Sequence, residues 1–310
     1  MTRIPVFGRA HVEAAVSPER ALGAVRDAFV AYARGEWTMP PKVYVPAYPA
    51  GDFRAMPALG SGHALLKWVT SFPGNPARGL PTVTGLVLLS DASNGMLVAA
   101  FDAGAVTALR TGAAAVLAAE TLGRDGVAAV IGAGVNGRAA ARTFAARGRD
   151  VLIYDVDAAR AGAVANELGA RPAAHGEALR ADVVVTVTPG KEIVFGEGSL
   201  RPGQHVSLMG ADGPVKAEIA VEEMARVRMF CDDWEQASHN GDLAHAVEAS
   251  VVARDDVTQL GDVLTGNVEG RRSDDEITVF GSTGLAIQDL AIALAAMERA
   301  GKLNLPTIDL

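Results

Sequence analysis

The sequence has 310 residues, of which 49% are hydrophobic, 21% charged and only 5% aromatic, a balance typical of a folded α/β protein long enough for two domains. It carries 36 acidic and 28 basic residues, a net charge of -8 with no block of like charge, which argues against nucleic acid or an anionic membrane as a partner. The composition therefore favours a protein that acts on a small molecule.

The first clear element is a helix that begins after Ser17. A serine can cap a helix, Pro18 suits the first helical turn, and Gly35 marks the end. One apolar face follows helical spacing and is formed by Leu22, Val25, Phe29 and Tyr32. Residues 40–105 differ, because prolines separate short apolar runs such as 65–69 and 82–89, which predict strands of a twisted or mixed sheet.

The middle of the chain alternates between helical patterns and short β runs. An alanine-rich stretch at 105–122 predicts a helix. After it come the apolar runs 127–131, 151–154, 183–187 and 205–209. Their alternation with helices predicts a parallel, doubly wound sheet. Near the end, Ser282 is expected to cap a last helix, whose apolar stripe consists of Ile287, Leu290, Leu294 and Met297.

A glycine-rich loop joins the run 127–131 to the helix that follows it. Its pattern is Gly132-x-Gly134-x-x-Gly137, in which the first glycine permits a tight turn, the second lets the backbone approach a pyrophosphate, and the third lets the helix pack on the strand. The N-terminus of that helix offers free N–H groups to phosphate. Asp155 follows the next strand, where a carboxylate can accept hydrogen bonds from the adenosine ribose hydroxyls. The sequence therefore predicts a dinucleotide site, with NAD favoured over NADP.

The residue types that would indicate a disulfide, a metal or a membrane anchor give no signal. Cys231 is the only cysteine, which excludes an internal disulfide and fits a reducing cytoplasm. The six histidines lack the spacing of zinc ligands. The start of the chain lacks a signal-peptide pattern, and no uninterrupted apolar run approaches the roughly 20 residues that span a bilayer. We therefore expect a cytoplasmic protein without a metal and without a membrane partner.

Four further segments carry a resemblance that is more specific than the glycine loop. They are FRAMP at 53–57, LKWV with PGNP and GLPTV within 66–83, TALRTGAA at 107–114, and FGSTGLAIQD at 280–289. Together with the loop, they resemble the ornithine cyclodeaminase and mu-crystallin family, which also contains archaeal-type alanine dehydrogenases and ketimine reductases. The resemblance runs from about residue 40 to residue 295.

The resemblance implies a fold and an assembly. Members of that family are typically homodimers in which the N-terminal segment and the C-terminal helix form one domain. We therefore expect an α/β protein with a Rossmann-type doubly wound parallel sheet at residues 113–284, which binds the dinucleotide. This domain would be inserted into a second, α+β domain for substrate binding and dimerisation, formed by residues 1–112 plus 285–310. The partners implied are a second copy of the chain and a small carboxylate substrate.

The resemblance also implies roles for individual residues. Lys67 matches the lysine that contacts the carboxylate and the carbonyl or imine region of the substrate, and Arg110 matches the arginine that grips the carboxylate. Their chemistry agrees, because a guanidinium forks onto a carboxylate and an ammonium can polarise a developing oxyanion or amine. Asp212 matches the catalytic aspartate, which would transfer a proton, and Thr111 would touch the cofactor's phosphate or ribose.

Each of these residues also has a simpler interpretation. Lys67 could extend from a strand edge to solvent, Arg110 could form an ordinary helix salt bridge, and Asp212 could only organise a turn. Lys42 and Arg54 are expected to add cations to the substrate pocket. Further cofactor contacts are expected from Val135, Asn136, Thr186, Thr188 and Ser282.

Arg54 is the departure from the family pattern that matters most for the substrate. The ornithine-specific members carry an acid at this place, and an arginine would repel the distal amine of ornithine. The alanine-dehydrogenase-like members do carry an arginine there. A cluster of cations could serve one carboxylate or two, so a dicarboxylic imino acid remains open as a substrate.

These features predict an enzyme that reversibly reduces a small 2-oxo acid or its imine to an L-amino acid. Hydride would pass between the nicotinamide and the α-carbon of the substrate. Lys67, Arg54 and Arg110 would orient the carboxylate and polarise the acceptor, and Asp212 would supply or accept the proton. Two alternatives remain open. One is a cyclodeaminase that releases ammonia, recycles its NAD and forms a cyclic amino acid, and the other is a crystallin-like binding protein without turnover.

Overall fold

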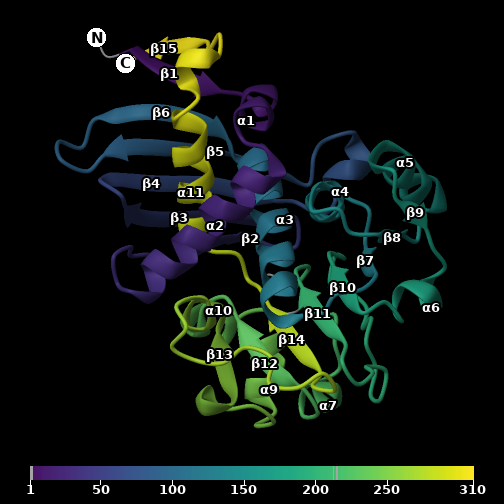
Figure 1. The fold of residues 1–310 in the computed structure, drawn as a ribbon. Helices are drawn as coiled ribbons and strands as arrows, with labels where there is room; N and C mark the ends of the chain where they lie inside the picture. The colour runs from purple at the N-terminus through teal and green to yellow at the C-terminus, as the bar shows by residue number, and fades with distance from the viewer. Residues whose placement is uncertain (1–2, 212, 214–215) are drawn as a thin grey trace. The chain divides into compact units, whose positions relative to one another are not determined.

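The computed structural model describes residues 3–211, 213 and 216–310. The chain forms two compact units, one of Met1–Arg110 with Leu285–Leu310 and the other of Thr111–Gly284, so the second is an insertion into the sequence of the first. In Figure 1 the purple and blue segments and the yellow C-terminal end belong to the first unit, and the teal and green segments belong to the second.

The first unit is built on a seven-stranded sheet in the order β15-β1-β6-β5-β4-β3-β2. Its strands are β1 (Arg3–Phe7), β2 (Val43–Ala47), β3 (Gly51–Gly60), β4 (His63–Ser71), β5 (Val83–Asp91), β6 (Leu97–Asp102) and β15 (Thr307–Asp309). β1 and β6 run parallel and the other neighbours run antiparallel, so the predicted mixed sheet is confirmed. The pairing of β1 with β15 brings the two ends of the chain side by side (Figure 1).

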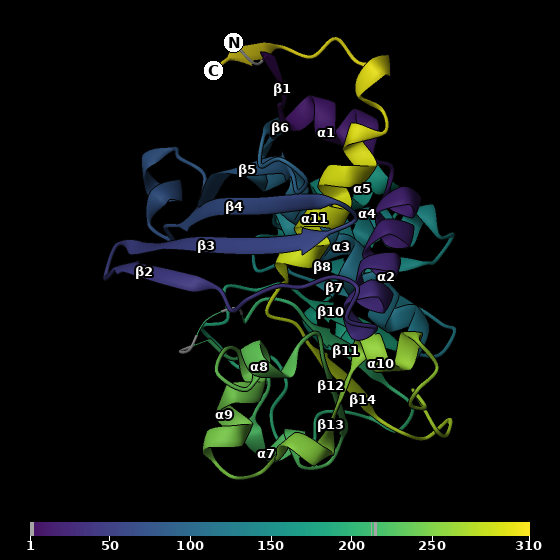
Figure 2. The same ribbon diagram turned by 90° about the vertical axis from the view of Figure 1, so that its left-hand side faces the viewer.

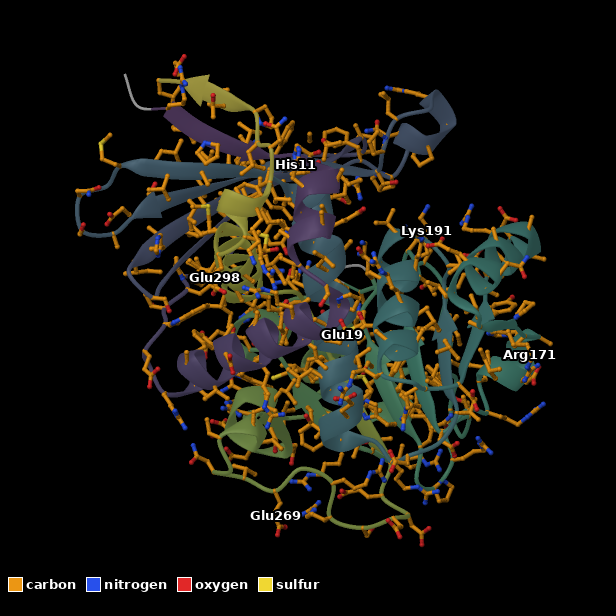
Figure 3. All side chains as sticks on the ribbon, turned by 45° about the horizontal axis from the view of Figure 1, so that its top comes forward. His11, Glu19, Arg171, Lys191, Glu269 and Glu298 are labelled. Carbon is orange, nitrogen blue, oxygen red and sulfur yellow. The ribbon has the colours of Figure 1, made fainter. Side chains whose placement is uncertain are left out.

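The helices of the first unit cover one face of this sheet. They are α1 (Arg9–Ala15), α2 (Pro18–Ala33) and α11 (Ala286–Met297), with short 3-10 helices η1 (Asn75–Arg78) and η3 (Ala300–Lys302). α2 begins as predicted, because the Ser17 hydroxyl accepts a hydrogen bond from the backbone N–H of Arg20 at 3.3 Å. α11 lies across β3, β4 and β5 with α2 beside it (Figure 1 and Figure 2). The Arg20 side chain pairs with Glu298, which Figure 3 labels just after the end of α11.

The predicted start of the last helix at Ser282 is wrong. α11 begins at Ala286 after Leu285, and the side chain of Gln288 accepts a hydrogen bond from the backbone N–H of Leu285 at 3.4 Å. The Ser282 hydroxyl instead donates to Oδ2 of Asp232 at 2.9 Å. The backbone N–H groups of Thr283 and Gly284 also donate to Oδ2 of Asp232, and Gly284 has a φ of 77°, so residues 283–285 are not helical and the helix begins only after Leu285.

Helix α3 (Ala103–Leu122) contains the point at which the chain passes from the first unit to the second. Within the described part of the chain, α3 is the one helix whose length and apolar composition would be sufficient to cross a membrane. The sequence pattern did not single it out. Of its most apolar stretch, 78% is buried inside the protein, which is typical of a core helix.

The second unit is built on an eight-stranded sheet in the order β13-β12-β14-β11-β10-β7-β8-β9. Its strands are β7 (Ala128–Ile131), β8 (Val151–Tyr154), β9 (Arg171–Pro172), β10 (Val183–Thr186), β11 (His205–Leu208), β12 (Arg228–Cys231), β13 (Val257–Gln259) and β14 (Thr278–Gly281). All of these pairings are parallel, which confirms the predicted α/β fold class.

Helices cover both faces of this parallel sheet (Figure 1). They are α4 (Val135–Ala146), α5 (Ala158–Leu168), α6 (His175–Ala178), α7 (Val221–Met224), α8 (Trp234–Ala237), α9 (Asp242–Glu248) and α10 (Leu260–Leu264), with a 3-10 helix η2 (Arg254–Asp256). Side chains alternate along β7: Ala129 and Ile131 join an apolar core with Met224 and Leu243, whereas Val130 lies on the α4 side. This burial on both faces explains why the strands read as continuous apolar runs.

β7 lies where the order of the sheet reverses. The chain passes from β7 to β8 and β9 on one side, and then returns to β10 on the other side. Ligands of open parallel sheets bind beyond the carboxyl ends of the strands at such a reversal. The loops that follow β7 and β10 are therefore the first places to look for a cofactor site.

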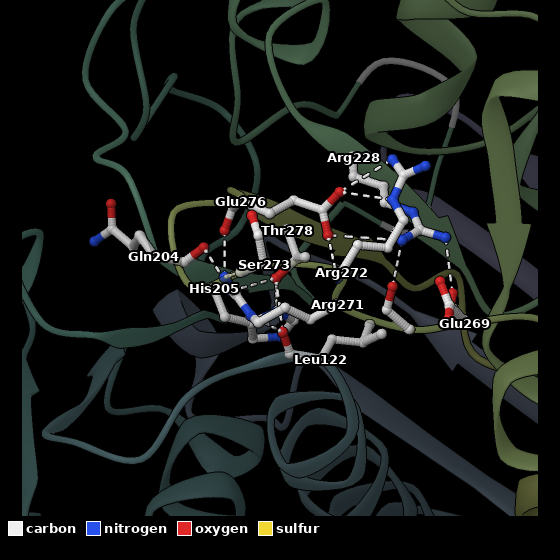
Figure 4. A network of polar contacts seen from close by, with 11 residues as sticks. Leu122, Gln204, His205, Arg228, Glu269, Arg271, Arg272, Ser273, Glu276 and Thr278 are labelled. Atoms are coloured by element: carbon white, nitrogen blue, oxygen red, sulfur yellow. Dashed lines mark hydrogen bonds and ion pairs between the residues drawn. The ribbon is translucent and has the colours of Figure 1, made fainter.

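A buried polar network ties β11 and β14 to the end of α3 (Figure 4). Nδ1 of His205 lies 2.9 Å from the hydroxyl of Thr278, which donates to the carbonyl of Leu122 at 3.0 Å. Arg271 donates to the same carbonyl at 2.8 Å. Burial and the charge of Arg271 lower the pKa of His205 to about 3, so the ring is neutral at physiological pH. We assign His205 to the structure of the sheet rather than to catalysis.

Candidate active site

Lys67 lies in the middle of β4 on the face that α11 covers. Leu65 and Val69, two positions away on either side, are buried on the same face. The Lys67 side chain is only 1% exposed, and its Nζ donates to Oδ1 of Asp289 at 2.9 Å. The interpretation in which this lysine extends to solvent is therefore wrong. Burial lowers the pKa of Lys67 to about 8, although the Asp289 carboxylate opposes the shift.

Arg110 joins Lys67 at the same carboxylate. Its Nε lies 3.7 Å from Oδ1 of Asp289, and its Nη1 donates to Oε1 of Gln288 at 3.5 Å. Three buried atoms of this group have no hydrogen-bond partner within the described residues: Nε of Arg110, Nε2 of Gln288 and Oδ2 of Asp289. Buried polar atoms are nearly always satisfied in native proteins. Several unsatisfied atoms beside two cations therefore mark a place where a polar ligand fits.

Arg54 supplies a third cation from the neighbouring strand. In the register of β3 and β4, Arg54 lies opposite Val69 and belongs to the buried face of the sheet. Its charge contributes to the lowered pKa of Lys67, after burial and Arg110. Its Nε donates to Oδ1 of Asp52 at 2.6 Å, and its guanidinium lies 5.2 Å from the centre of the Tyr44 ring. The first unit thus brings the three predicted cations together. We call the group of Arg54, Lys67 and Arg110 the cation cluster.

The other predicted substrate and catalytic residues are less informative. Lys42 is partly exposed and precedes β2 directly. Asp212 lies outside the described residues. Asp289 was missed by the sequence analysis, although it stands in one of the family-like segments. The signal that could have revealed it is a carboxylate within an otherwise apolar helical stripe, which needs a buried cation as its partner.

The glycine loop has the geometry that its pattern predicts. Gly132 has a φ of 103°, and a Cβ placed there would lie 2.7 Å from the carbonyl oxygen of Val187. A Cβ on Gly137 would lie 1.7 Å from the carbonyl oxygen of Gly132, so this glycine lets α4 pack against the loop. Gly134 caps α4 without a side-chain hydrogen bond, and nothing lies within 4 Å of its Cβ position. The first turn of α4 is therefore open to an anion.

Residues around the loop support the same assignment. Val135 is 61% exposed at the first position of α4, and Asn136 beside it is partly buried. Asp155 follows β8, and its Oδ2 accepts a hydrogen bond from the backbone N–H of Ala133 at 2.7 Å. Arg160 reaches the other oxygen of Asp155 at 3.5 Å. The acid predicted to contact the ribose therefore lies directly against the glycine loop.

The hydroxyl residues predicted to bind the cofactor have different surroundings. The Thr186 hydroxyl donates to Oε2 of Glu218 at 2.8 Å, and the backbone N–H of Thr188 donates to Oε1 at 2.9 Å. Ser282 donates to Asp232, as described above. Thr111 is buried, and its hydroxyl has no hydrogen-bond partner within the described residues. Of these residues, Thr111 thus has the unsatisfied group that a ligand could complete.

Glu218 and Asp242 form a pair of buried carboxyls that the sequence analysis missed. Besides its contacts with Thr186 and Thr188, Glu218 accepts a hydrogen bond from the backbone N–H of Gly210 at 2.8 Å. It therefore ties the loop after β10 to the loop after β11. Burial raises the pKa of Glu218, and burial together with the Glu218 charge raises the pKa of Asp242 to about 7. No local sequence pattern distinguishes such carboxyls from surface acids.

The chain matches a family model along almost its entire length. Residues 6–303 match the model described as the ornithine cyclodeaminase/mu-crystallin family. The chain belongs to this family. The predicted family is thereby confirmed.

Individual relatives in the family are similar over their full length. The alanine dehydrogenase of Archaeoglobus fulgidus is 41% identical over 307 residues, which cover 95% of this chain and 94% of that protein. A solved structure described as an archaeal alanine dehydrogenase dimer with bound NAD has a TM-score of 0.93, 39% identity and full coverage of both chains. The Δ1-pyrroline-2-carboxylate reductase of Thermococcus litoralis, solved with NADH and L-proline, has a TM-score of 0.92 at 26% identity and covers 99% of this chain and 100% of that one.

Proposed function

We propose that the protein is an NAD(H)-dependent oxidoreductase that reversibly reduces a small 2-oxo acid or its imine to an L-amino acid. The cation cluster carries this proposal, because Lys67 and Arg54 on one face of the sheet, together with Arg110 of α3, form a site for a carboxylate and for the polar atom beside it. Family membership supplies the reaction class, since the relatives named above are an alanine dehydrogenase and an imine reductase.

The second unit is proposed to bind the dinucleotide. Gly132, Gly134 and Gly137 would hold the pyrophosphate at the open first turn of α4, and Asp155 would accept hydrogen bonds from the adenosine ribose. The unsatisfied hydroxyl of Thr111 would donate to the cofactor. When bound, the nicotinamide supplies or accepts the hydride. The relatives solved with NAD or NADH support NAD as the cofactor.

The first unit is proposed to hold the substrate. The Arg110 guanidinium would grip the carboxylate, while the Lys67 ammonium would donate a hydrogen bond to the carbonyl oxygen or the imine nitrogen. Asp289 keeps the proton on Lys67, because its carboxylate lies 2.9 Å from Nζ and raises a pKa that burial lowers. Arg54 would add positive charge beside the carboxylate. Asp212 is proposed to exchange the proton with the substrate, as its match to the family pattern implies.

We also propose that the protein is a cytoplasmic homodimer. The face of the first sheet that faces away from α11 exposes a row of apolar side chains at Val43, Leu66, Trp68 and Leu86. Trp68, the largest of these side chains, is 43% exposed, and its ring stacks on that of Phe53 with 5.7 Å between the ring centres. An exposed apolar face of this kind marks a protein interface, and the related alanine dehydrogenase is a dimer.

The function is tested by following NADH oxidation with pyruvate, glyoxylate and cyclic imines, with and without ammonium. Lys67→Ala should lower kcat/KM by about a hundredfold or more, because it removes the donor at the reacting atom. Lys302→Ala removes an exposed lysine of the same unit and serves as the matched control. Absence of NADH oxidation with every substrate would overturn the proposal. Release of ammonia from ornithine without net NADH would instead indicate a cyclodeaminase.

A further inference from the structure

Asp52 and Arg54 form a fixed ion pair on the substrate face of β3. They are two positions apart on one strand, so both side chains lie on the same face, and each residue is only 7% exposed. Nε of Arg54 donates to Oδ1 of Asp52 at 2.6 Å, and Nη2 donates to Oδ2 at 3.3 Å. Asp52 thus occupies one edge of the guanidinium in the bidentate manner by which an arginine recognises a free carboxylate.

This pair lies beside the lysine proposed to act on the substrate. In the sheet register Met56 is opposite Lys67 and Val69 is opposite Arg54, so Arg54 and Lys67 are diagonal neighbours on one face. The charge of Arg54 also lowers the pKa of Lys67, although by less than burial and the charge of Arg110 do. Arg54 is therefore within electrostatic range of a substrate held at Lys67, and Asp52 lies two residues farther along β3 from Lys67 than Arg54 does.

Each of the two buried acids described beside the cation cluster is paired with one of its cations. Asp289 accepts from Lys67 and lies near Arg110, and Asp52 accepts from Arg54, so two carboxylates face three cations. A distal substrate carboxylate that reached Arg54 would lie close to the Asp52 carboxylate on the same guanidinium, and two carboxylates so close together repel each other.

We propose that Asp52 determines the substrate class of this site. Because Asp52 is paired with Arg54, the enzyme accepts 2-oxo acids or imines with a single carboxylate and excludes those with a second, distal carboxylate. This inference rests on the proposed function, because it concerns the same site. It closes the choice between one carboxylate and two that the sequence leaves open. Asp52 acts through Arg54 and is a specificity-determining residue, not a catalytic one.

The test compares 2-oxobutyrate with oxaloacetate, which differ only by a methyl group in place of the second carboxylate. We expect the wild-type protein to prefer 2-oxobutyrate in NADH oxidation with ammonium. Asp52→Asn keeps the shape and one acceptor oxygen but removes the charge, and it should raise the ratio of kcat/KM for oxaloacetate to that for 2-oxobutyrate by at least about tenfold. Loss of structure alone lowers both rates and does not move this ratio.

Control variants separate this proposal from its competitors. Asp27→Asn removes one exposed carboxylate of α2 in the same unit and should leave the ratio unchanged. Asp52→Ser is the second variant should the asparagine protein not fold, and the wild-type preference is itself a test. A wild-type enzyme that uses oxaloacetate as well as 2-oxobutyrate, or a folded Asp52 variant with an unchanged ratio, overturns the proposal. A wild-type protein inactive on both acids and on imines overturns the proposed function instead.

Discussion

Replacing Asp289 by asparagine removes the carboxylate that keeps Lys67 protonated. Oδ1 of Asp289 lies 2.9 Å from Nζ, and both its charge and its hydrogen bond raise the pKa of Lys67 against the effect of burial. Two unit charges about 4 Å apart interact by about 4 kcal/mol at an effective dielectric constant of about 20. One pKa unit corresponds to about 1.4 kcal/mol, so the loss amounts to at most about 3 units.

Water and structural relaxation reduce this figure, and we expect the pKa of Lys67 to fall by at least about one unit from its value of about 8. The ammonium is the form that donates to the substrate. Wild-type kcat/KM should therefore fall as the pH rises through about 8, and in Asp289→Asn the same decline should occur at lower pH. The variant would lose about half of its activity or more at pH 7 and recover part of it in acid.

The assay is the pH profile of kcat/KM for NADH oxidation with one substrate, measured for both proteins. Ionisation of the substrate and of ammonium is common to both, so the displacement between the two profiles reports the enzyme. Glu298→Gln removes a carboxylate at the exposed end of the same helix and should leave the profile in place. A decline at the wild-type pH, or one displaced upward, would refute the role assigned to Asp289.

Three other changes probe the rest of the structure. Gly134→Ala adds a Cβ with nothing within 4 Å, so the protein should fold, yet its affinity for NADH in a fluorescence titration should fall by about tenfold or more where the methyl group meets the pyrophosphate. The pKa of Asp242 is raised from 3.8 to about 7 in the folded protein, so its contribution to the free energy of unfolding is full below about pH 4 and is lost as the pH rises through 7. Urea unfolding of the wild type should show the free energy of unfolding declining over this pH range, and Asp242→Asn should show a flatter pH dependence. Trp68→Glu should convert the dimer to a monomer in light scattering, whereas Val251→Glu, which changes an exposed apolar residue of the second unit, should not.

The parallel sheet could be predicted because its strands are buried on both faces. Runs such as 183–187 are apolar at every position, and the loop after 127–131 needs glycine for steric reasons that act within a few residues. Lys67 and Arg110 were identified through family resemblance, since nothing in their local sequence distinguishes them from surface cations. Local physics and motif spacing therefore predict the fold and part of the site.

The rest of the site depends on contacts between segments that are far apart in the sequence. Asp289 meets Lys67 across 222 positions, and Asp232 holds Ser282 across 50. The error at Ser282 shows the consequence, because the distant buried acid Asp232 accepts the backbone N–H groups of Thr283 and Gly284 and so holds the residues after Ser282 in a non-helical loop. Glu218 has a similar role, since it collects donors from the ends of two strands. Such partners follow only from the tertiary fold.

The features that set the cation cluster apart have one physical cause. Burying Lys67 between a sheet and an apolar helix lowers the pKa of its ammonium, and Nε of Arg110 and Oδ2 of Asp289 beside it are buried without a hydrogen bond from any residue that the structure describes. Each unsatisfied buried polar atom costs about 1–3 kcal/mol. A carboxylate substrate would satisfy the guanidinium, and a substrate nitrogen could donate to the free aspartate oxygen. The binding of a small amino or imino acid would thus supply hydrogen bonds to these atoms and remove the free-energy cost of leaving them unsatisfied in the protein without substrate.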